Sequence, residues 1–589
     1  MAAHPKETRG IRIPFRFSVS LLRTYLTPHW FKASGLTLLL FGCLGFEILG
    51  PQLLGHFIDS IQSSMSVLVP LVLLFLGLAI ANQLVTAFAS YVSEDISWRA
   101  TNALRADLTL HCLNLDRSFH QEHTPGELIE RVDGDIALLS TFFSTFVFSV
   151  LARVLLLIGI VVLTCFVDWR VGLLLLAFTA LVMVLLQPLQ GIAVPHFRAA
   201  RQASAEFASF LEERLSSIED TQSLGAQSYV MFRFNQLARR MLRTTRLSSV
   251  TGQFFSSAIE ICLALTVAAV LTLGAYLLRG GQMSLGTIYV MYYYTTLLSQ
   301  SLYAITYQVN QLQSATASIG RITELYHTPT ALVDGPGVPL PTGPLSVRFD
   351  DVSFGYTPEK KVLRDLSFEL CAGKTLGVLG RTGSGKTTLT RLLYRAYDVQ
   401  QGAIQIGGVD VRHATLGELR SRIGVVTQDV QLFHASLRDN LTFFDPGVSD
   451  ERLKHVISDL HLGQWYVSLP DGLDTILSGG GMTLSSGEAQ LLAFARVFLQ
   501  DPALVILDEA SSRLDPVTEK LIEGALARLL AGRTGMVIAH HLETVQQVDD
   551  LLILEGGTIC EYGDRKKLAA DPTSRFSYLL KTGLAEVRA

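Results

Sequence analysis

The amino-acid sequence predicts a multidomain membrane protein, in which an all-α six-helix transmembrane domain precedes a soluble α/β domain. Three observations lead to this fold class. Apolar residues make up 49% of the 589 residues and charged residues only 17%, which is far from an average soluble composition. Six long apolar segments occupy the first half of the chain. In the second half, short β-rich runs alternate with helical patterns, as in a mostly parallel sheet covered by helices. These runs lie at 347–352, 376–379, 423–426, 504–507, 535–539 and 551–554.

The composition divides the chain into four parts. We expect an N-terminal interfacial segment at 1–30, because apolar residues there mix with arginine and serine. A transmembrane domain with long cytoplasmic helical extensions is expected at 31–326, and the α/β domain at 345–589. Between them, HTPTALVDGPGVPLPTGP at 327–344 contains five prolines and is expected to be a linker.

Each apolar segment is long enough to cross a bilayer, because a hydrocarbon core of about 30 Å needs about 20 helical residues. The segments lie at about 33–58, 67–91, 146–166, 171–189, 258–278 and 285–307. Connections after the first, third and fifth segments are short, whereas those after the second and fourth are long and rich in arginine. The positive-inside rule therefore predicts that both long loops and both termini are cytoplasmic.

Charge and cysteine content narrow the function classes. The formal charge of −4 gives no reason to expect nucleic acid as a partner. The six cysteines are dispersed, so neither a disulfide framework nor a zinc site is expected. No cleavable signal pattern precedes the first apolar segment, which is expected to remain as a membrane span. The lipid bilayer is thus a predicted partner.

A glycine-rich turn between a predicted strand and a predicted helix carries the clearest chemical signal. The stretch 376–394 reads LGVLGRTGSGKTTLTRLLY and contains the motif G-x-x-x-x-G-K-[ST], which cradles phosphates in this context. Lys386 is expected to reach the β- and γ-phosphates of ATP, and the Thr387 hydroxyl to hold Mg²⁺. The ATP-binding residues predicted here are Gly380, Arg381, Thr382, Gly383, Ser384, Gly385, Lys386, Thr387 and Thr388.

Two carboxylates follow a second buried strand. The run LVILDEAS, at 504–511, has four apolar residues before Asp508 and Glu509. Strands of α/β folds present ligand-binding residues at their carboxyl ends. Asp508 is expected to bind Mg²⁺ directly or through water, and Glu509 to orient and polarise the attacking water. Alone, the pair could equally be an acidic helix start, but the phosphate-binding motif favours the catalytic interpretation.

Taken together, these motifs resemble those of the ATP-binding cassette (ABC) superfamily, and nearly the whole chain resembles an exporter-type half-transporter. In the membrane half, the resemblance rests on PQLLGHFID at 51–59, TPGELIERVDGD at 124–135 and GGQMSLG at 280–286. It implies an α/β P-loop NTPase (ABC) domain fused to the six-helix domain, with ATP and Mg²⁺ as cofactors and a second half-transporter as partner.

The resemblance also implies roles for residues outside the two motifs. Tyr356 matches the aromatic residue that stacks on adenine, and Gln428 matches the glutamine that touches Mg²⁺ and senses the membrane domain. His540 matches the histidine that contacts the γ-phosphate. The signature sequence is LSSGE at 484–488, and the D-loop contains Asp515. The residues expected to contact ATP across the dimer are Ser485, Ser486, Gly487, Glu488 and Asp515; the expected catalytic residues are Glu509, His540 and Gln428; and the expected Mg²⁺ ligands are Thr387, Gln428 and Asp508.

Three elements of the chain depart from the family pattern. Ser486 and Glu488 replace a glycine and a glutamine of the usual L-S-G-G-Q signature. The loop TILSGGG at 475–481 lacks the family's Glu–Arg pair, and Arg513 replaces an alanine. The resemblance places all three elements against the other chain of a dimer, while the elements for the chain's own nucleotide are intact. We therefore expect a different chain as partner, with one complete and one degenerate site.

Three charged residues fall inside predicted spans, where each costs a few kcal/mol unless it is paired or hydrated. They are Glu47, Arg153 and Glu260, of which the last two lie at similar depth. One interpretation is a structural ion pair plus a residue that faces a water-filled cavity. The alternative is that they contact the transported substrate directly.

The sequence thus predicts ATP-hydrolysing export of an unidentified substrate across the bacterial inner membrane by alternating access. A nucleotide-gated channel or regulatory subunit, or an importer on an exporter scaffold, is an alternative, although Glu509 favours ATP turnover. A soluble ABC ATPase that acts on nucleic acid is disfavoured by the six predicted spans.

Overall fold

The structure is a computed structural model, which describes residues 23–582 except 63, 142–143, 145–147, 358, 429, 461, 478–483, 509–515, 539–544 and 546. The chain forms two compact units. The first contains the residues up to Leu113 together with Pro125–Thr328, and the second contains Asn114–Thr124 together with the residues from Pro329 onward. The first unit is helical and the second is α/β, which confirms the predicted fold class.

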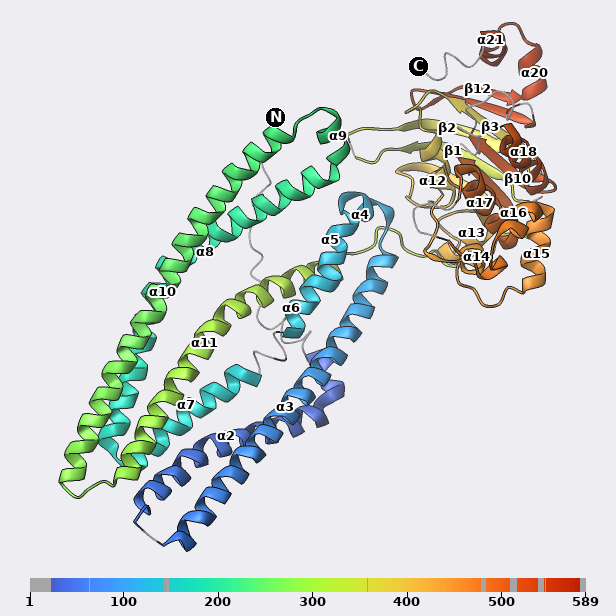
Figure 1. Cartoon of the computed structure of the whole chain (residues 1–589). Coiled ribbons are helices and arrows are strands. Elements are labelled where there is room, and N and C mark those ends of the chain that lie inside the picture. The colour runs from blue at the N-terminus through green and yellow to red at the C-terminus, as the bar shows by residue number, and fades with distance from the viewer. Residues whose placement is uncertain are drawn as a thin grey trace. The chain divides into compact units, whose positions relative to one another are not determined.

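The first unit consists of long helices joined by short turns (Figure 1). Its elements are η1 (Thr27–His29), α2 (Trp30–Asp59), α3 (Met65–Asn114), α5 (Pro125–Ile129), the π-helix η2 (Glu130–Gly134), α6 (Asp135–Thr141), α7 (Phe148–Val167), α8 (Trp169–Ser216), α9 (Ile218–Ser223), α10 (Gln227–Arg279) and α11 (Leu285–Tyr326). In Figure 1, α8 and α10 run side by side as two long antiparallel helices that α9 joins.

Each of the six predicted spans lies within a helix, namely α2, α3, α7, α8, α10 or α11, the third from Phe148 onward. Four helical stretches of the described chain are long and apolar enough to cross a membrane: Arg23–Asp59, Met65–Asn114, Val150–Val167 and Gln227–Arg279. A shorter apolar stretch, Trp169–Val182, begins α8. Several helices extend well past a 30 Å hydrocarbon core, since α3 has 50 residues and α10 has 53.

The apolar core of the first unit forms where α11 packs against α2, α7 and α10. Ile160 of α7, Leu175 of α8, Ile259 of α10 and Leu298 of α11 are almost completely buried in this cluster. Gly55 of α2 lies so close to α11 that a Cβ atom there would come within 2.6 Å of a Val290 methyl carbon. The close approach of α2 and α11 therefore depends on this glycine.

A buried carboxylate fastens α6 to α11 outside the predicted spans. The fully buried Asp135, at the start of α6, accepts hydrogen bonds from Ser318 Oγ at 2.8 Å and from Arg321 Nε at 2.8 Å. Arg321 Nη2 also donates to it. Burial removes water from the Asp135 carboxylate, and the hydrogen bonds from the bidentate arginine and the serine replace those that water would form.

The second unit contains a mostly parallel sheet with the strand order β12-β11-β3-β10-β9-β6. Its strands are β3 (Thr375–Gly380), β6 (Ile423–Val426), β9 (Leu504–Asp508), β10 (Thr534–Ile538), β11 (Asp550–Glu555) and β12 (Thr558–Asp564). Only the edge strand β12 is antiparallel to its neighbour. Strands β3, β9 and β10 are buried along nearly their whole length, as expected for strands covered on both faces.

A second sheet is antiparallel, with the order β2-β1-β4-β5. Its strands are β1 (Val347–Phe354), β2 (Leu363–Leu370), β4 (Gln401–Ile406) and β5 (Val409–Asp410). The assignment of the run 347–352 to the mostly parallel sheet was wrong, because this run forms β1 here. A short connection lets β2 fold back on β1, and the apolar pattern of a single strand does not specify the direction of its neighbour.

Helices cover the sheets and complete two apolar clusters, one around β9 and α17 and one between β1 and β3. The helices of this unit are α4 (Arg117–Glu122), α12 (Lys386–Leu393), α13 (Leu416–Arg422), α14 (Leu437–Thr442), α15 (Asp450–Asp459), α16 (Gly463–Ser468), η4 (Gly472–Asp474), α17 (Ser486–Gln500), α18 (Pro516–Leu530), α20 (Arg565–Ala570) and α21 (Arg575–Thr582). A two-stranded sheet pairs β7 (Ala435–Ser436) with β8 (Ile476–Leu477).

Most of the predicted linker is packed onto the second unit. Asp116, before α4, accepts a hydrogen bond from the Ala331 N–H at 2.7 Å. Burial alone would raise the pKa of Asp116, but hydrogen bonds from Ser118, Ala331 and Phe119 lower it below its ordinary value. Further contacts join Gly337 and Val338 N–H to His413 O, Leu340 N–H to Glu418, and Leu416 N–H to Asp334. We call residues 329–344 the strap.

We predict that Asp135→Ala destabilises the first unit by about 2–3 kcal/mol, because it removes a charged acceptor from three hydrogen bonds and leaves Arg321 without its partner. Partial exposure of Arg321 keeps the loss below that of a fully buried pair. Thermal unfolding of the purified protein in detergent measures the change.

Asp133→Ala is the matched control, since Asp133 lies two residues away, is 71% exposed and contacts Arg105 at 3.1 Å. An exposed pair of this kind contributes less than about 1 kcal/mol. Equal losses for the two variants would contradict the role given to Asp135.

Candidate ATP site

The order of the parallel strands brings distant segments to one edge of the sheet. Strand β10 pairs with β3 on one side and with β9 on the other, so that Ile538 lies opposite both Val378 and Asp508. Strand β6 lies on the far side of β9. The glycine-rich turn follows β3, Asp508 ends β9, and Gln428 lies two residues after β6. These residues therefore share the carboxyl edge of the sheet, where α/β folds bind ligands.

Glycine is required at two positions of the turn from β3 to α12. Gly380 has φ +153°, and a Cβ atom there would lie 2.3 Å from the Leu554 carbonyl oxygen of β11. Gly385, at the N-cap of α12, has φ +105°, and a Cβ atom there would lie 2.5 Å from Leu363 Cδ2. Side chains at these positions would strain the backbone and push neighbouring strands apart. The turn thus keeps backbone N–H groups accessible to an anion at the start of α12.

Lys386 lies inside this turn. Its ammonium group donates to the Gly380 carbonyl oxygen at 2.6 Å and to the Arg381 carbonyl oxygen at 3.2 Å, and the residue is only 6% exposed. The Ser384 hydroxyl is buried and has no hydrogen-bond partner among the described residues. A held cation, a buried hydroxyl without a partner and a helix N-terminus form a set of donors that fits a polyphosphate.

Oxygen ligands suited to Mg²⁺ lie beside the turn. Asp508 is half-buried at the end of β9, and Thr387 exposes its side chain in the first turn of α12. Carboxylate and hydroxyl oxygens are the hard ligands that Mg²⁺ takes together with phosphate oxygens. Burial raises the pKa of Tyr394, and Asp508 raises it further, while Arg117 opposes both. The aspartate therefore lies within electrostatic range of the tyrosine that ends α12.

Tyr356 lies over α12. Its hydroxyl is 3.1 Å from Thr388 Oγ1, and Arg391 Nη1 donates to the same hydroxyl at 3.1 Å. The ring packs edge-on against Tyr397, with centroids 5.3 Å apart, and the residue is 41% exposed. A partly exposed aromatic ring at this position suits base stacking. Sequence reasoning missed Arg391 and Tyr397, although Thr388 and Arg391, three residues apart, lie on one helix face.

Three predicted site residues, Glu509, His540 and Asp515, lie outside the described residues. Their places in the chain are informative, because 509–515 directly follows β9 and 539–544 directly follows β10. Strands β9 and β10 both end at the carboxyl edge that carries Asp508. Gln428 is described and exposed.

The signature residues begin α17. Ser485 is the N-cap, and its Oγ accepts a hydrogen bond from the Glu488 N–H at 3.2 Å. In return, the Ser485 N–H donates to Glu488 Oε2 at 2.6 Å, which completes a capping box. Gly487 is buried between them, and Ser486 is the first helical residue.

The three predicted membrane charges lie on three helices: Glu47 on α2, Arg153 on α7 and Glu260 on α10. Glu47 and Arg153 are half-buried, and Glu260 is exposed. Within the described part of the chain, none of the three forms an ion pair with another. The ion-pair interpretation for Arg153 and Glu260 is therefore not supported here.

A groove of about 490 Å³ opens next to Gln428. Thr427, Phe433 and Phe443 line it, together with Arg496 of α17, whose guanidinium stacks 4.7 Å from the Phe443 ring. Burial lowers the pKa of Arg496, which also donates to the Asn440 and Gln431 carbonyl oxygens. Arg496 thus supports the aromatic side chains that line the groove. The sequence analysis did not identify this groove, because no motif contains its residues.

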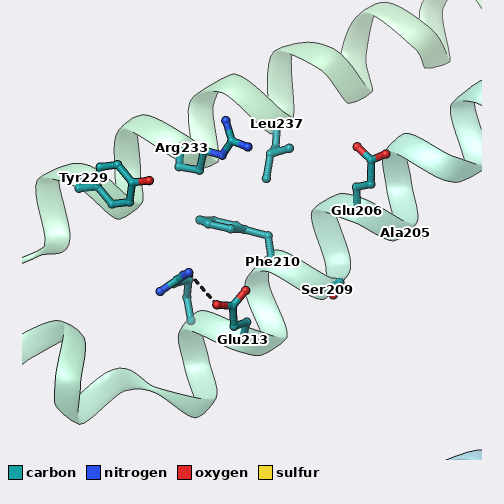
Figure 2. Close-up of a pocket in the computed structure, with 9 residues that line it drawn as sticks. Ala205, Glu206, Ser209, Phe210, Glu213, Tyr229, Arg233 and Leu237 are labelled. Atoms are coloured by element: carbon teal, nitrogen blue, oxygen red, sulfur yellow. Dashed lines mark hydrogen bonds and ion pairs between the residues drawn. The ribbon is translucent and has the colours of Figure 1, made fainter. Parts of the chain in front are cut away.

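A second hollow, of about 650 Å³, lies between the C-terminal part of α8 and the N-terminal part of α10 (Figure 2). Phe210 lies at its centre, and Arg214 pairs with Glu213 at 2.7 Å. Tyr229 and Arg233 face it from α10. Its two arginines are offset by Glu206 and Glu213, so it has no clear charge preference.

Comparison with known proteins agrees with this arrangement. Residues 35–302 match the family model described as the ABC transporter transmembrane region, and residues 363–512 match the one described as ABC transporter. The uncharacterized ABC transporter ATP-binding protein YfiC of Bacillus subtilis (strain 168) is 30% identical over 528 residues, which cover 89% of this chain and 87% of the relative.

Two further proteins extend the comparison. The fatty acid ABC transporter ATP-binding/permease protein of Mycobacterium tuberculosis (strain CDC 1551 / Oshkosh) is 31% identical over 472 residues, which cover 79% of this chain and 74% of the relative. Among solved structures, a bacterial Atm1-family ABC exporter with ATP bound superposes with a TM-score of 0.76, at 24% identity, over 94% of this chain and 97% of that one. The chain therefore belongs to the ABC transporter family, with the membrane and ATP-binding regions fused in one polypeptide as in a half-transporter.

Proposed function

We propose that this protein exports a substrate across the bacterial inner membrane by alternating access, driven by ATP hydrolysis, as one half of a dimer. The observation that carries the proposal is the glycine-rich turn with Lys386 at the same sheet edge as Asp508, in a chain with membrane-spanning helices. The relatives are bacterial and are named as ATP-binding or permease proteins, which supports the membrane assignment. Their names assign no common substrate.

In the proposed mechanism, Lys386 and the N–H groups before α12 bind the phosphates of ATP. Tyr356 presents its exposed ring to the adenine. Thr387, Asp508 and Gln428 would hold Mg²⁺, which when bound neutralises charge on the β- and γ-phosphates. Glu509 accepts a proton from the attacking water, and His540 contacts the γ-phosphate. Loss of the γ-phosphate then weakens the contacts that hold two ATP-binding domains together, and the transporter resets.

Exposed apolar surfaces support a second chain. Around α9, Leu215, Ile218 and Leu224 are 68%, 45% and 81% exposed, which is unusual for a cytoplasmic helix end. In the second unit, Phe433 and Phe443 expose 44% and 58% of their surface along the groove beside Gln428. In one common mode of protein recognition, an apolar helix surface lies in a hydrophobic groove. We infer that a second chain covers the apolar residues around α9 and the aromatic groove beside Gln428.

We propose further that the partner is a different chain. Glu488 adds a negative charge to the signature helix start, where a partner's ATP would approach with its own negative charge. Binding without efficient hydrolysis is therefore expected at the site that LSSGE closes. The partner should in turn supply a regular signature to the site that contains Lys386.

Lys386→Ala should weaken ATP binding by about ten- to a hundredfold, because it removes charge-assisted hydrogen bonds worth about 1.5–3 kcal/mol. Binding of a fluorescent ATP analogue to the purified complex measures this. Lys374→Ala is the control, since Lys374 is a partly exposed lysine that pairs with the buried Asp550 at 3.5 Å, away from the glycine-rich turn. Unchanged affinity in Lys386→Ala would count against the phosphate cradle.

Glu509→Gln should leave ATP binding intact and lower the rate of hydrolysis by about 10²- to 10⁴-fold, because only the activation of water is lost. Phosphate release is the readout, and Glu451→Gln, an exposed change on α15, is the control. Hydrolysis near the wild-type rate in Glu509→Gln would remove this residue from the mechanism.

Purification of the full chain from its native membrane should yield a complex with a second, different half-transporter. Mass spectrometry of that complex identifies the partner, whose sequence should contain L-S-G-G-Q and should lack an equivalent of Glu509 or His540. A stable and active complex that contains only this chain would overturn the heterodimer and leave two equivalent sites.

A further inference from the structure

One face of α11 carries polar and aromatic side chains through its predicted span. The face consists of Tyr289, Tyr292, Tyr293, Thr296, Gln300 and Tyr303, which recur at helical spacing. All six are at least partly exposed, and Tyr292 and Tyr293 are 40% and 38% exposed. The other side of α11 packs into the core through Met291, Tyr294 and Leu298. We call the exposed face the tyrosine stripe.

Lipid is an unsuitable neighbour for this stripe. Thr296 and Gln300 follow Leu285, the first residue of α11, by 11 and 15 residues. At 1.5 Å per residue they lie about 16 and 22 Å along the helix, inside a hydrocarbon core of about 30 Å. Tyrosine belts at membrane surfaces do not reach this depth, and an amide in hydrocarbon costs several kcal/mol. The stripe must therefore face water or a bound molecule.

A carboxylate lies at the inner end of the stripe. The Tyr303 hydroxyl donates to the Ser256 carbonyl oxygen at 2.9 Å, which holds α10 against α11 at this level. Glu260 lies one helical turn from Ser256, is exposed, and interacts electrostatically with Tyr303. Within the described residues it has no ion-pair partner. Glu260 lies near the end of the predicted span, where an exposed carboxylate is stabilised by water or by a cation beside it.

We propose that the tyrosine stripe and Glu260 bind the transported substrate and that this substrate is an organic cation with an aromatic or apolar body. The inference rests on the proposed transport function. Tyrosine faces attract cations through the negative face of the ring, and Glu260 supplies the counter-charge. Glu47 adds a second carboxylate on α2, which also packs against α11. Two of the three charged residues in the predicted spans are carboxylates and only Arg153 is a cation, so the binding of an anionic substrate is disfavoured.

The test uses two probes of almost equal size and shape, tetraphenylphosphonium and tetraphenylborate, which differ in the sign of their charge. Each is titrated into the purified full-length complex without ATP, and binding is measured by equilibrium dialysis. We expect the phosphonium ion to bind at least about tenfold more tightly than the borate, because desolvated cation–π and carboxylate contacts favour it alone. Equal binding of the two ions, tighter binding of the borate or no binding of the phosphonium overturns the proposal.

Variants then locate the site. Glu260→Gln should weaken phosphonium binding about tenfold or more and leave borate binding unchanged, and Tyr292→Ala should weaken it more than Tyr292→Phe, which keeps the ring. The controls are Tyr276→Ala, at a 71% exposed position of α10 outside the stripe, and Glu94→Gln, at an exposed position of α3. Equal losses in controls and stripe variants, or none in Glu260→Gln, contradict the assignment.

Two outcomes distinguish failure of the substrate assignment from failure of the proposed transport function. If the complex hydrolyses ATP in a Glu509-dependent manner but does not discriminate between the probes, only the substrate class is wrong. If it hydrolyses no ATP, the proposed function fails whatever the probes do. Finally, efficient thiol-specific cross-linking of Tyr292→Cys to the second chain of the purified complex would show that the stripe is an interface between chains, which also overturns the proposal.

Discussion

The parallel pairing of β3, β10 and β9 is the constraint on which the ATP site depends. These strands are buried on both faces, and a fixed register aligns their carboxyl ends. The same crowding determines the phosphate turn, because β11 leaves no room for a Cβ atom at Gly380. A slip by one residue would turn every side chain of a strand to the opposite face and misplace Asp508. The geometry of the site is thus a consequence of sheet packing.

A second constraint is a pair of hydrogen bonds between the two segments by which the chain enters the second unit. It enters after α3 at Asn114 and again after α11 at Pro329. The Asp116 carboxylate ties the first entry to the strap through the Ala331 N–H. On the side of the first unit, His111 Nε2 lies 3.0 Å from the Leu325 carbonyl oxygen and joins the ends of the same two helices. The ends of α3 and α11 are therefore fastened to each other within the first unit, and the two segments that follow them are fastened to each other within the second.

Features that depend on local sequence could be predicted, whereas those that depend on distant pairing could not. Run 423–426 is strand β6 as expected, and the P-loop joins β3 to α12, because apolar runs and glycine spacing act over a few residues. The antiparallel sheet and the strap were missed, since the Asp116–Ala331 contact spans more than 200 residues of chain. The contact of Arg391 with Tyr356 likewise needs the folded β1. By contrast, the capping box of Ser485 and Glu488 is a local S-x-x-E pattern and could have been recognised.

That capping box clarifies the departure from the usual signature. Glutamine and glutamate both complete an S-x-x-[EQ] box, so the helix start of α17 does not require the family's glutamine. What Glu488 changes is charge. Its carboxylate accepts the Ser485 N–H at 2.6 Å, which places a negative group at the positive end of a 15-residue helix. This stabilises the folded chain, but it offsets the favourable field that an ATP phosphate of a second chain would meet there. Stability of the helix and affinity for that phosphate are therefore in conflict, which supports the proposal that the site closed by LSSGE binds ATP without turning it over efficiently.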